Sequence, residues 1–263
     1  MAAREKALAE AVASWWKQNH GGFTNLPKTQ ALMPLRAHLL ASFEQEVGPV
    51  GLLDRFQVTG VIATWWGEAQ NDLKTLAAQG FRGLVEAWTS SIVSALEDEK
   101  SKENPLDHAL TKHLLPQYLA EISELEAKKA ELEAPLKGSS PGEEEEETEE
   151  FEERLSEEEL KAIRKELGAL KKKLKTLKDD FKMQLEAAVT KLDEASSREL
   201  VLGILRGNLN AILGRYVAEH RQQVTETFEE WWAKYRVTLK SIEQERDDSA
   251  KKLSGFLRGL GYV

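Results

Sequence analysis

The feature that most constrains this sequence is a run of apolar residues between Leu160 and Phe181 whose spacing alternates between three and four. Its members are Leu160, Ile163, Leu167, Leu170, Leu174, Leu177 and Phe181. Such a stripe stays on one face of a helix over several turns only when the helix supercoils around a partner. After Phe181 the register slips by one residue to Leu185, which predicts local unwinding.

A second stripe with the same alternation precedes the first. Its positions are Leu115, Tyr118, Ile122, Leu125, Lys129, Leu132 and Leu136. The two stripes are separated by Gly138–Gly142 and by a glutamate run, a connector that does not continue a helix. We therefore predict that they fold onto each other as a long antiparallel coiled-coil hairpin over 105–195, with a flexible acidic loop at 138–155.

The remaining sequence also predicts helices. Apolar residues recur every three or four positions, and no turn is flanked by alternating Val, Ile and Thr. Breaks are expected at His20–Pro27, Val47–Gly51 and Lys100–Pro105. The predicted fold is all-α, a helical bundle with the hairpin inserted. Its expected parts are an N-terminal bundle segment at 1–104, the hairpin at 105–195, and long C-terminal helices at 196–263 that pack back on the bundle.

Aromatic doublets and glycines within the predicted helices indicate how these helices pack. The doublets are Trp15-Trp16, Trp65-Trp66 and Trp231-Trp232. Neighbouring helical residues point about 100° apart, so we expect at least one Trp of each doublet in the core and the other free for a partner. The candidate interface residues are Trp65, Trp66, Trp231, Trp232 and Tyr235. Gly203, Gly207 and Gly214 indicate either close helix packing or a locally weak helix.

The charge is unevenly distributed. The 263 residues carry 36 Lys and Arg against 45 Asp and Glu, a net charge of −9. Residues 139–159 hold twelve Glu and one Arg, which leaves 35 basic against 33 acidic residues elsewhere. Lys161–Lys182 is the basic exception, and its candidates for weak DNA contact are Lys171, Lys172, Lys173 and Lys175. The heptad seam favours a coiled-coil flank over DNA contact there, so any DNA binding should be weak and independent of sequence.

Motifs of catalysis and ligation are missing. The sequence has no cysteine, which excludes disulfides and zinc–thiolate sites. It has no phosphate-cradling loop, no H-E-x-x-H and no G-x-S-x-G, so no catalytic, cofactor-binding or metal residue is predicted. His108 and His113 beside Asp107 are a weak metal signal. No apolar stretch is long enough to span a membrane, and we expect a soluble, cytoplasmic protein.

Four blocks of sequence carry a family resemblance. They are Leu52–Trp66, Arg215–Arg221, Trp231–Leu239 and Leu253–Tyr262. They resemble the region downstream of the catalytic domain in modification (M) subunits of type I restriction systems, which are N6-adenine DNA methyltransferases. In that family a heptad-rich helical region lies between such blocks, as it does here.

The catalytic part of that family has no counterpart in this sequence. The glycine-rich S-adenosylmethionine motif is missing, and Asn104-Pro105 is followed by Leu106 instead of the second proline of the adenine-binding motif. The chain thus resembles only the C-terminal helical region of the family, whether as an excised piece or a separate gene product. S-adenosylmethionine is expected in the parent methyltransferase and not in this chain.

The resemblance implies a scaffold that assembles a larger enzyme. It would dock onto the specificity (S) subunit and position the methyltransferase domain on DNA, touching DNA only indirectly. The alternative is a stand-alone structural coiled-coil module for protein interaction with no DNA role. An enzyme with an unrecognised site is the least favoured interpretation.

Overall fold

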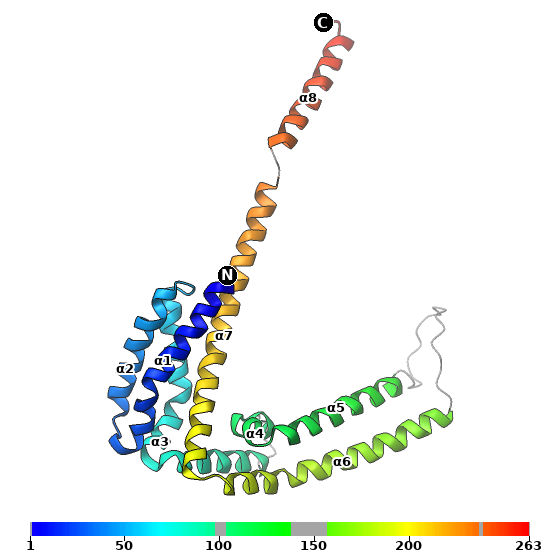
Figure 1. Cartoon of the computed structure of the whole chain (residues 1–263). Coiled ribbons are helices and arrows are strands. Elements are labelled where there is room, and N and C mark those ends of the chain that lie inside the picture. The colour runs from blue at the N-terminus through cyan, green and yellow to red at the C-terminus, as the bar shows by residue number, and fades with distance from the viewer. Residues whose placement is uncertain (1, 98–103, 138–156, 237–238, 263) are drawn as a thin grey trace. The chain divides into compact units, whose positions relative to one another are not determined.

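A computed structural model describes residues 2–97, 104–137, 157–236 and 239–262 (Figure 1). Within these residues every regular element is a helix, which confirms the all-α prediction. The α-helices are α1 (Ala2–Thr29), α2 (Leu32–Val47), α3 (Arg55–Glu97), α4 (Ala109–Leu114), α5 (Pro116–Lys137), α6 (Glu157–Thr190), α7 (Glu194–Tyr235) and α8 (Leu239–Gly259). Two short 3₁₀ turns, η1 (Gly48–Val50) and η2 (Pro105–Asp107), lie between them.

The first predicted break, at His20–Pro27, is wrong because α1 continues through it to Thr29. Helices α1 and α2 lie close together at Gly22, where a Cβ would lie 2.9 Å from the Leu35 side chain. Pro27 falls in the last turn, and the helix ends two residues after it, at Thr29. The chain turns instead at Gln30, which has a positive φ of 51°.

The second predicted break, at Val47–Gly51, is confirmed. The η1 turn ends at Gly51, whose φ of 64° favours glycine. Helix α3 then begins with a reciprocal cap in which the Gln57 backbone N–H donates to Asp54 Oδ1 at 2.8 Å and the Asp54 N–H donates to Gln57 Oε1 at 3.0 Å. Gly80, with φ 77° and ψ −176°, interrupts α3 and divides it into two helical stretches.

The predicted start of the hairpin at Pro105 is only partly right. Asn104 caps the turn as expected, with Oδ1 accepting from the Leu106 backbone N–H at 3.2 Å. The helix does not run on, however, because Pro116 lacks an N–H and disfavours helical geometry at Leu115, which has φ −124° and ψ 47°. Therefore η2, α4 and α5 replace one continuous helix. The predicted acidic loop at 138–155 lies outside the described residues.

The chain forms two compact units, each discontinuous in sequence. The first contains the described residues of 1–15, 40–65 and 209–263, and the second those of 16–39 and 66–208. Both cut across the consecutive segments predicted from the sequence, because α1, α2, α3 and α7 each contribute one stretch to either unit.

In the first unit, Trp15 occupies the core with no exposed surface. Its ring meets Phe43 edge-on at 4.9 Å between centroids, and its Nε1–H donates to Ser42 Oγ at 2.9 Å. Helices α3 and α7 approach closely at Gly60, where a Cβ would lie 2.7 Å from the Tyr216 hydroxyl. Gly203, Gly207 and Gly214, by contrast, have no atom within 4 Å of such a Cβ, so the close-packing interpretation of these three is wrong.

The second unit contains the contact between α5 and α6 (Figure 1). Ile122, Leu125 and Leu174 form a buried cluster, against which Tyr118, Leu170 and Leu177 pack. The Tyr118 hydroxyl donates to the Leu177 backbone carbonyl. Ion pairs join Glu133 to Lys171 at 2.9 Å and Glu126 to Lys178 at 2.8 Å, so the two helices run in opposite directions. The outer seam positions Ile163 and Leu167 are only half-buried.

Candidate partner interface

The three tryptophan doublets differ in burial: two are buried and one is exposed. Both members of the first two are buried, with Trp15 and Trp65 at 0% exposure, Trp16 at 6% and Trp66 at 7%. Trp65 and Trp66 are thus core residues that offer a partner almost no surface, which corrects their prediction as interface residues. Trp231 and Trp232 are 56% and 75% exposed, so the expectation of one core Trp in every doublet is wrong for the third.

The exposed doublet belongs to a longer aromatic surface at the end of α7. Tyr235 is 69% exposed and Phe228 is 62% exposed. Val224, Phe228, Trp231 and Tyr235 follow one another at spacings of four, three and four, so they share one face of the helix. We call this face, together with the exposed apolar residues of α8, the C-terminal arm. Arg221 Nη2 pairs with Glu5 of α1 at 2.8 Å, and every residue of α7 after Arg221 except Val224 is exposed.

This face contains a shallow groove with a volume of about 270 Å³. Its lining residues are His220, Gln223, Val224, Thr227, Phe228 and Trp231. They make up two overlapping sets with the spacing i, i+3, i+4 and i+7, beginning at His220 and at Val224. Four residues in that arrangement form the hole that receives a knob side chain from a facing helix. The surface of α7 therefore has the shape that a helical partner requires.

Helix α8 extends the apolar surface. Ile242, Leu253, Phe256 and Leu260 are all more than half exposed, and the last three follow one another at spacings of three and four. Among the side chains of α8 that the structure describes, Leu257 alone is partly buried, and all the others are exposed. The packing of 196–263 back on the bundle stays a prediction.

Sequence reasoning missed several members of this arm, chiefly Phe228, Phe256 and Tyr262, which are 62%, 69% and 77% exposed. The signal that could have found Phe228 is its position three residues before Trp231, with which its ring makes an edge contact at 5.8 Å. Periodicity marks such residues as sharing a face, and the same periodicity also marks core residues. Only the burial found in the fold separates the two cases.

The four candidate DNA-contact lysines divide into two kinds. Lys171 pairs with Glu133 and Lys173 pairs with Glu121, each at 2.9 Å, so both lysines join α6 to α5. Lys172 and Lys175 are exposed, and no carboxylate of the described residues forms an ion pair with either. The structure thus separates residues that the sequence grouped together.

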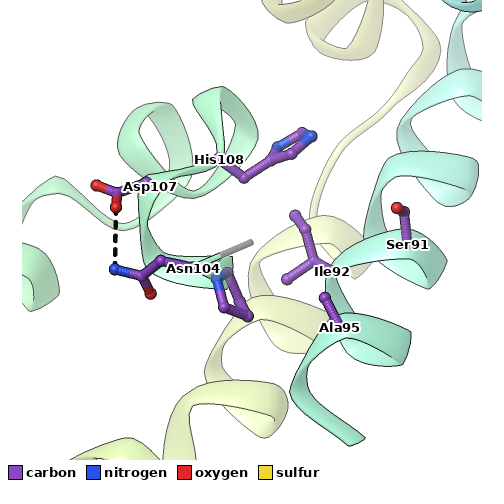
Figure 2. A pocket seen from close by; sticks show the side chains of 7 residues that line it. Ser91, Ile92, Ala95, Asn104, Asp107 and His108 are labelled. Atoms are coloured by element: carbon purple, nitrogen blue, oxygen red, sulfur yellow. Dashed lines mark hydrogen bonds between the residues drawn. The ribbon is translucent and has the colours of Figure 1, made fainter. Parts of the chain in front are cut away.

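A cavity of about 360 Å³ lies between the end of α3 and η2 (Figure 2). Ser91, Ile92 and Ala95 line it from α3, and Asn104, Asp107 and His108 line it from the other side. Its polar groups already serve the local fold. Asn104 Nδ2 donates to Asp107 Oδ2 at 2.9 Å, and His108 Nδ1 accepts from the Leu110 backbone N–H at 3.1 Å. This arrangement caps two short helices.

Asp72 is linked to this region through Trp88. The Trp88 Nε1–H donates to Asp72 Oδ1 at 2.8 Å, and the Trp88 ring meets the His108 ring at 6.0 Å. Burial raises the pKa of Asp72 above its ordinary value, although the Trp88 hydrogen bond and the nearby His108 act in the opposite direction. A charged carboxylate at this position therefore costs stability at neutral pH, and its protonated form is favoured by folding.

We expect Asp72→Asn to be at least as stable as the natural chain at pH 7, because the amide oxygen still accepts from Trp88 without a buried charge. A raised folded-state pKa means that the native protein binds more protons than the unfolded one, so the natural chain gains stability from this group as the pH falls. The advantage of the variant should shrink accordingly. Urea denaturation of both chains between about pH 4 and pH 7 measures it, and a difference independent of pH would contradict the assignment.

Two further properties of the described residues bear on other functions. No three His, Cys, Asp or Glu side chains among them gather closely enough to bind a metal ion. None of the helices within that part of the chain has the length and apolarity to cross a membrane.

Comparison of the chain with protein-family models, with curated proteins and with solved structures found no match. The function must therefore be argued from the residues themselves.

Proposed function

We propose that this chain is a helical scaffold that assembles a type I restriction-modification methyltransferase. In this role the C-terminal arm docks onto the helices of the specificity subunit, while the rest of the chain carries the methyltransferase domain to its place on DNA. The observation that carries the proposal is the exposed aromatic face of α7. Phe228, Trp231 and Tyr235 are 56–69% exposed on this face, beside the partly buried Val224.

Two arguments support a helical partner. Exposed Trp and Tyr side chains are the residue types that supply most of the binding energy in protein interfaces. The groove between His220 and Trp231 has the spacing of coiled-coil holes, which suits the coiled-coil spacers expected of a specificity subunit. The resemblance of Trp231–Leu239 and Leu253–Tyr262 to the C-terminal blocks of modification subunits falls on this same arm.

The proposal extends to the hairpin and to the place of action. Helices α5 and α6 would form one antiparallel coiled coil, supported by their buried cluster and by ion pairs on both flanks of the seam. A protein that serves DNA modification would act in the cytoplasm, beside the chromosome. Catalysis and S-adenosylmethionine binding would belong to the methyltransferase domain.

Direct binding to the specificity subunit tests the proposal. The purified chain should form a stable complex with the specificity subunit of the same organism in calorimetry and size-exclusion chromatography. Trp231→Ala should weaken it by 2 kcal/mol or more, a factor of about 30 in Kd, because truncating an aromatic hot spot removes a central anchor. Phe56→Ala is the matched control, since Phe56 lies on α3 and is 86% exposed.

An unchanged Kd for the control and a weakened one for Trp231→Ala would support the docking role. Equal losses in the two variants would contradict the assignment of the arm as the docking surface. If the chain does not bind the specificity subunit and self-associates through Trp231 instead, the stand-alone coiled-coil module becomes the better interpretation.

A further inference from the structure

Helix α6 carries basic residues on two different faces. The heptad seam of Leu170, Leu174 and Leu177 faces α5. Residues that border such a seam are placed to reach the neighbouring helix, whereas residues on the opposite side point to solvent. Sorting the basic residues by face therefore separates those that stabilise the contact with α5 from those that do not.

The first set borders the seam and is paired. Lys171, Lys173 and Lys178 bind Glu133, Glu121 and Glu126 of α5 at 2.8–2.9 Å. All three lysines are about half exposed, so each pair contributes at most about 1 kcal/mol. Their presence is explained by the packing of α5 against α6.

The second set lies on the outward face. It consists of Lys161, Arg164, Lys165, Lys172 and Lys175, all exposed. At 100° per residue, Lys172 lies about 200° around the helix from both Leu170 and Leu174, directly opposite the seam. No carboxylate of the described residues forms an ion pair with any of the five. We call this set the outward basic stripe.

The stripe is free of acids and consists of two groups, one at 161–165 and one at 172–175. The only acidic residue between Lys161 and Lys175 is Glu166, which lies about 140° around the helix from Lys161. The distance from Lys161 to Lys175 is about 21 Å along the axis, which matches about six nucleotide steps of a DNA strand. Folding places five positive charges in one row where the contact with α5 does not use them.

We propose that the outward basic stripe binds the phosphate backbone of DNA. Lys and Arg side chains in a row neutralise successive phosphates, and such contacts carry no sequence information. An acidic membrane surface is the less suitable partner, because a helix that binds membranes needs an exposed apolar face and the apolar face of α6 is covered by α5. The proposal does not depend on the docking role of the C-terminal arm, since the stripe and the arm are on different helices.

The charge of the whole chain limits the affinity. With a net charge of −9 the chain as a whole repels DNA, and the glutamates of 143–153 compete for the same lysines. Screening confines each interaction to about 10 Å at 0.1 M salt, so the stripe acts on DNA that is already close. The binding should be weak, independent of sequence and strongly dependent on salt.

Fluorescence anisotropy of the full chain with a labelled 30-bp duplex of random sequence tests the proposal between 25 and 200 mM salt. The outward variant combines Lys165→Gln, Lys172→Gln and Lys175→Gln. The matched control combines Lys171→Gln, Lys173→Gln and Lys178→Gln, which removes the same charge from the same helix on its paired flanks. The outward variant should lose about 2.7 from the slope of log K against log salt, and at least tenfold in affinity at 50 mM salt.

The control should keep most of its slope and show a lower melting temperature, because it loses the ion pairs to α5. Lys172→Gln alone, at an exposed position, should lower the slope by about 0.9 and leave melting unchanged. Equal losses in the two triple variants would overturn the proposal, since they would indicate charge in general and not this face. The absence of binding at 25 mM salt, or tighter binding to phosphatidylserine vesicles at the same phosphate concentration, would also overturn it.

Discussion

Replacing Trp65 with alanine should lower the free energy of unfolding by about 3–5 kcal/mol, whereas Trp232→Ala should change it by less than about 0.5 kcal/mol. The two substitutions remove the same atoms from helices of the same fold. Trp65 has no exposed surface, so its removal leaves a cavity among packed side chains. Trp232 is 75% exposed, and water already surrounds most of its ring.

Urea denaturation followed by circular dichroism measures both values. The helical signal at zero urea is the control, because each variant must begin from the same helix content. A loss for Trp232→Ala comparable to that for Trp65→Ala would contradict the exposed position of the C-terminal doublet. It would also weaken the argument that the arm is available to a partner.

The second large effect is expected where α5 and α6 pack against each other around Leu174. Leu174 is 6% exposed within the cluster of Ile122 and Leu125, and Leu174→Ala should cost about 2–5 kcal/mol in the stability of this contact. Leu167→Ala makes the same chemical change seven residues earlier on the same face. It should cost clearly less, because the side chain of Leu167 is only half-buried.

Hydrogen exchange of the backbone amides in α6 is the suitable measurement, since it reports local opening even when the rest of the chain stays folded. Leu174→Ala should speed exchange around Phe181, which is 1% exposed and belongs to the same stripe. If the amide exchange rates of the two variants are the same, Leu174 and Leu167 are equally buried, and the cluster around Leu174 is not a distinct core.

The sequence predicted the helices well because each amphipathic stripe is a local pattern. The three-and-four spacing of the seam, the cap at Asn104 and the turn at Gly51 all depend on residues close together in the chain. Local signals failed at two places. The break predicted at His20–Pro27 is absent, and the break at Pro116 interrupts a hydrophobic period that otherwise continues from Leu115 to Tyr118.

Contacts between residues far apart in the sequence could not be predicted in the same way. The glycine that permits close packing is Gly60, which meets Tyr216 more than 150 residues later, and the regularly spaced glycines of α7 meet nothing. The candidate interface shows the same limit. Trp65-Trp66 and Trp231-Trp232 are identical as dipeptides, and only the neighbours that the fold brings to them make one doublet core and the other surface.

The discontinuous first unit has a consequence for synthesis on the ribosome. Its stretches at 1–15 and 40–65 leave the ribosome early, but the stretch of α7 that completes their core begins at Leu209. At about 5–20 residues per second, the ribosome takes about 7–30 s to make the intervening chain. During that time the earlier stretches lack the α7 residues of their unit, among them Tyr216, which lies against Gly60 in the finished protein. The nascent chain therefore offers chaperones an apolar target until α7 emerges, and a chain that stops before α7 should remain bound to them.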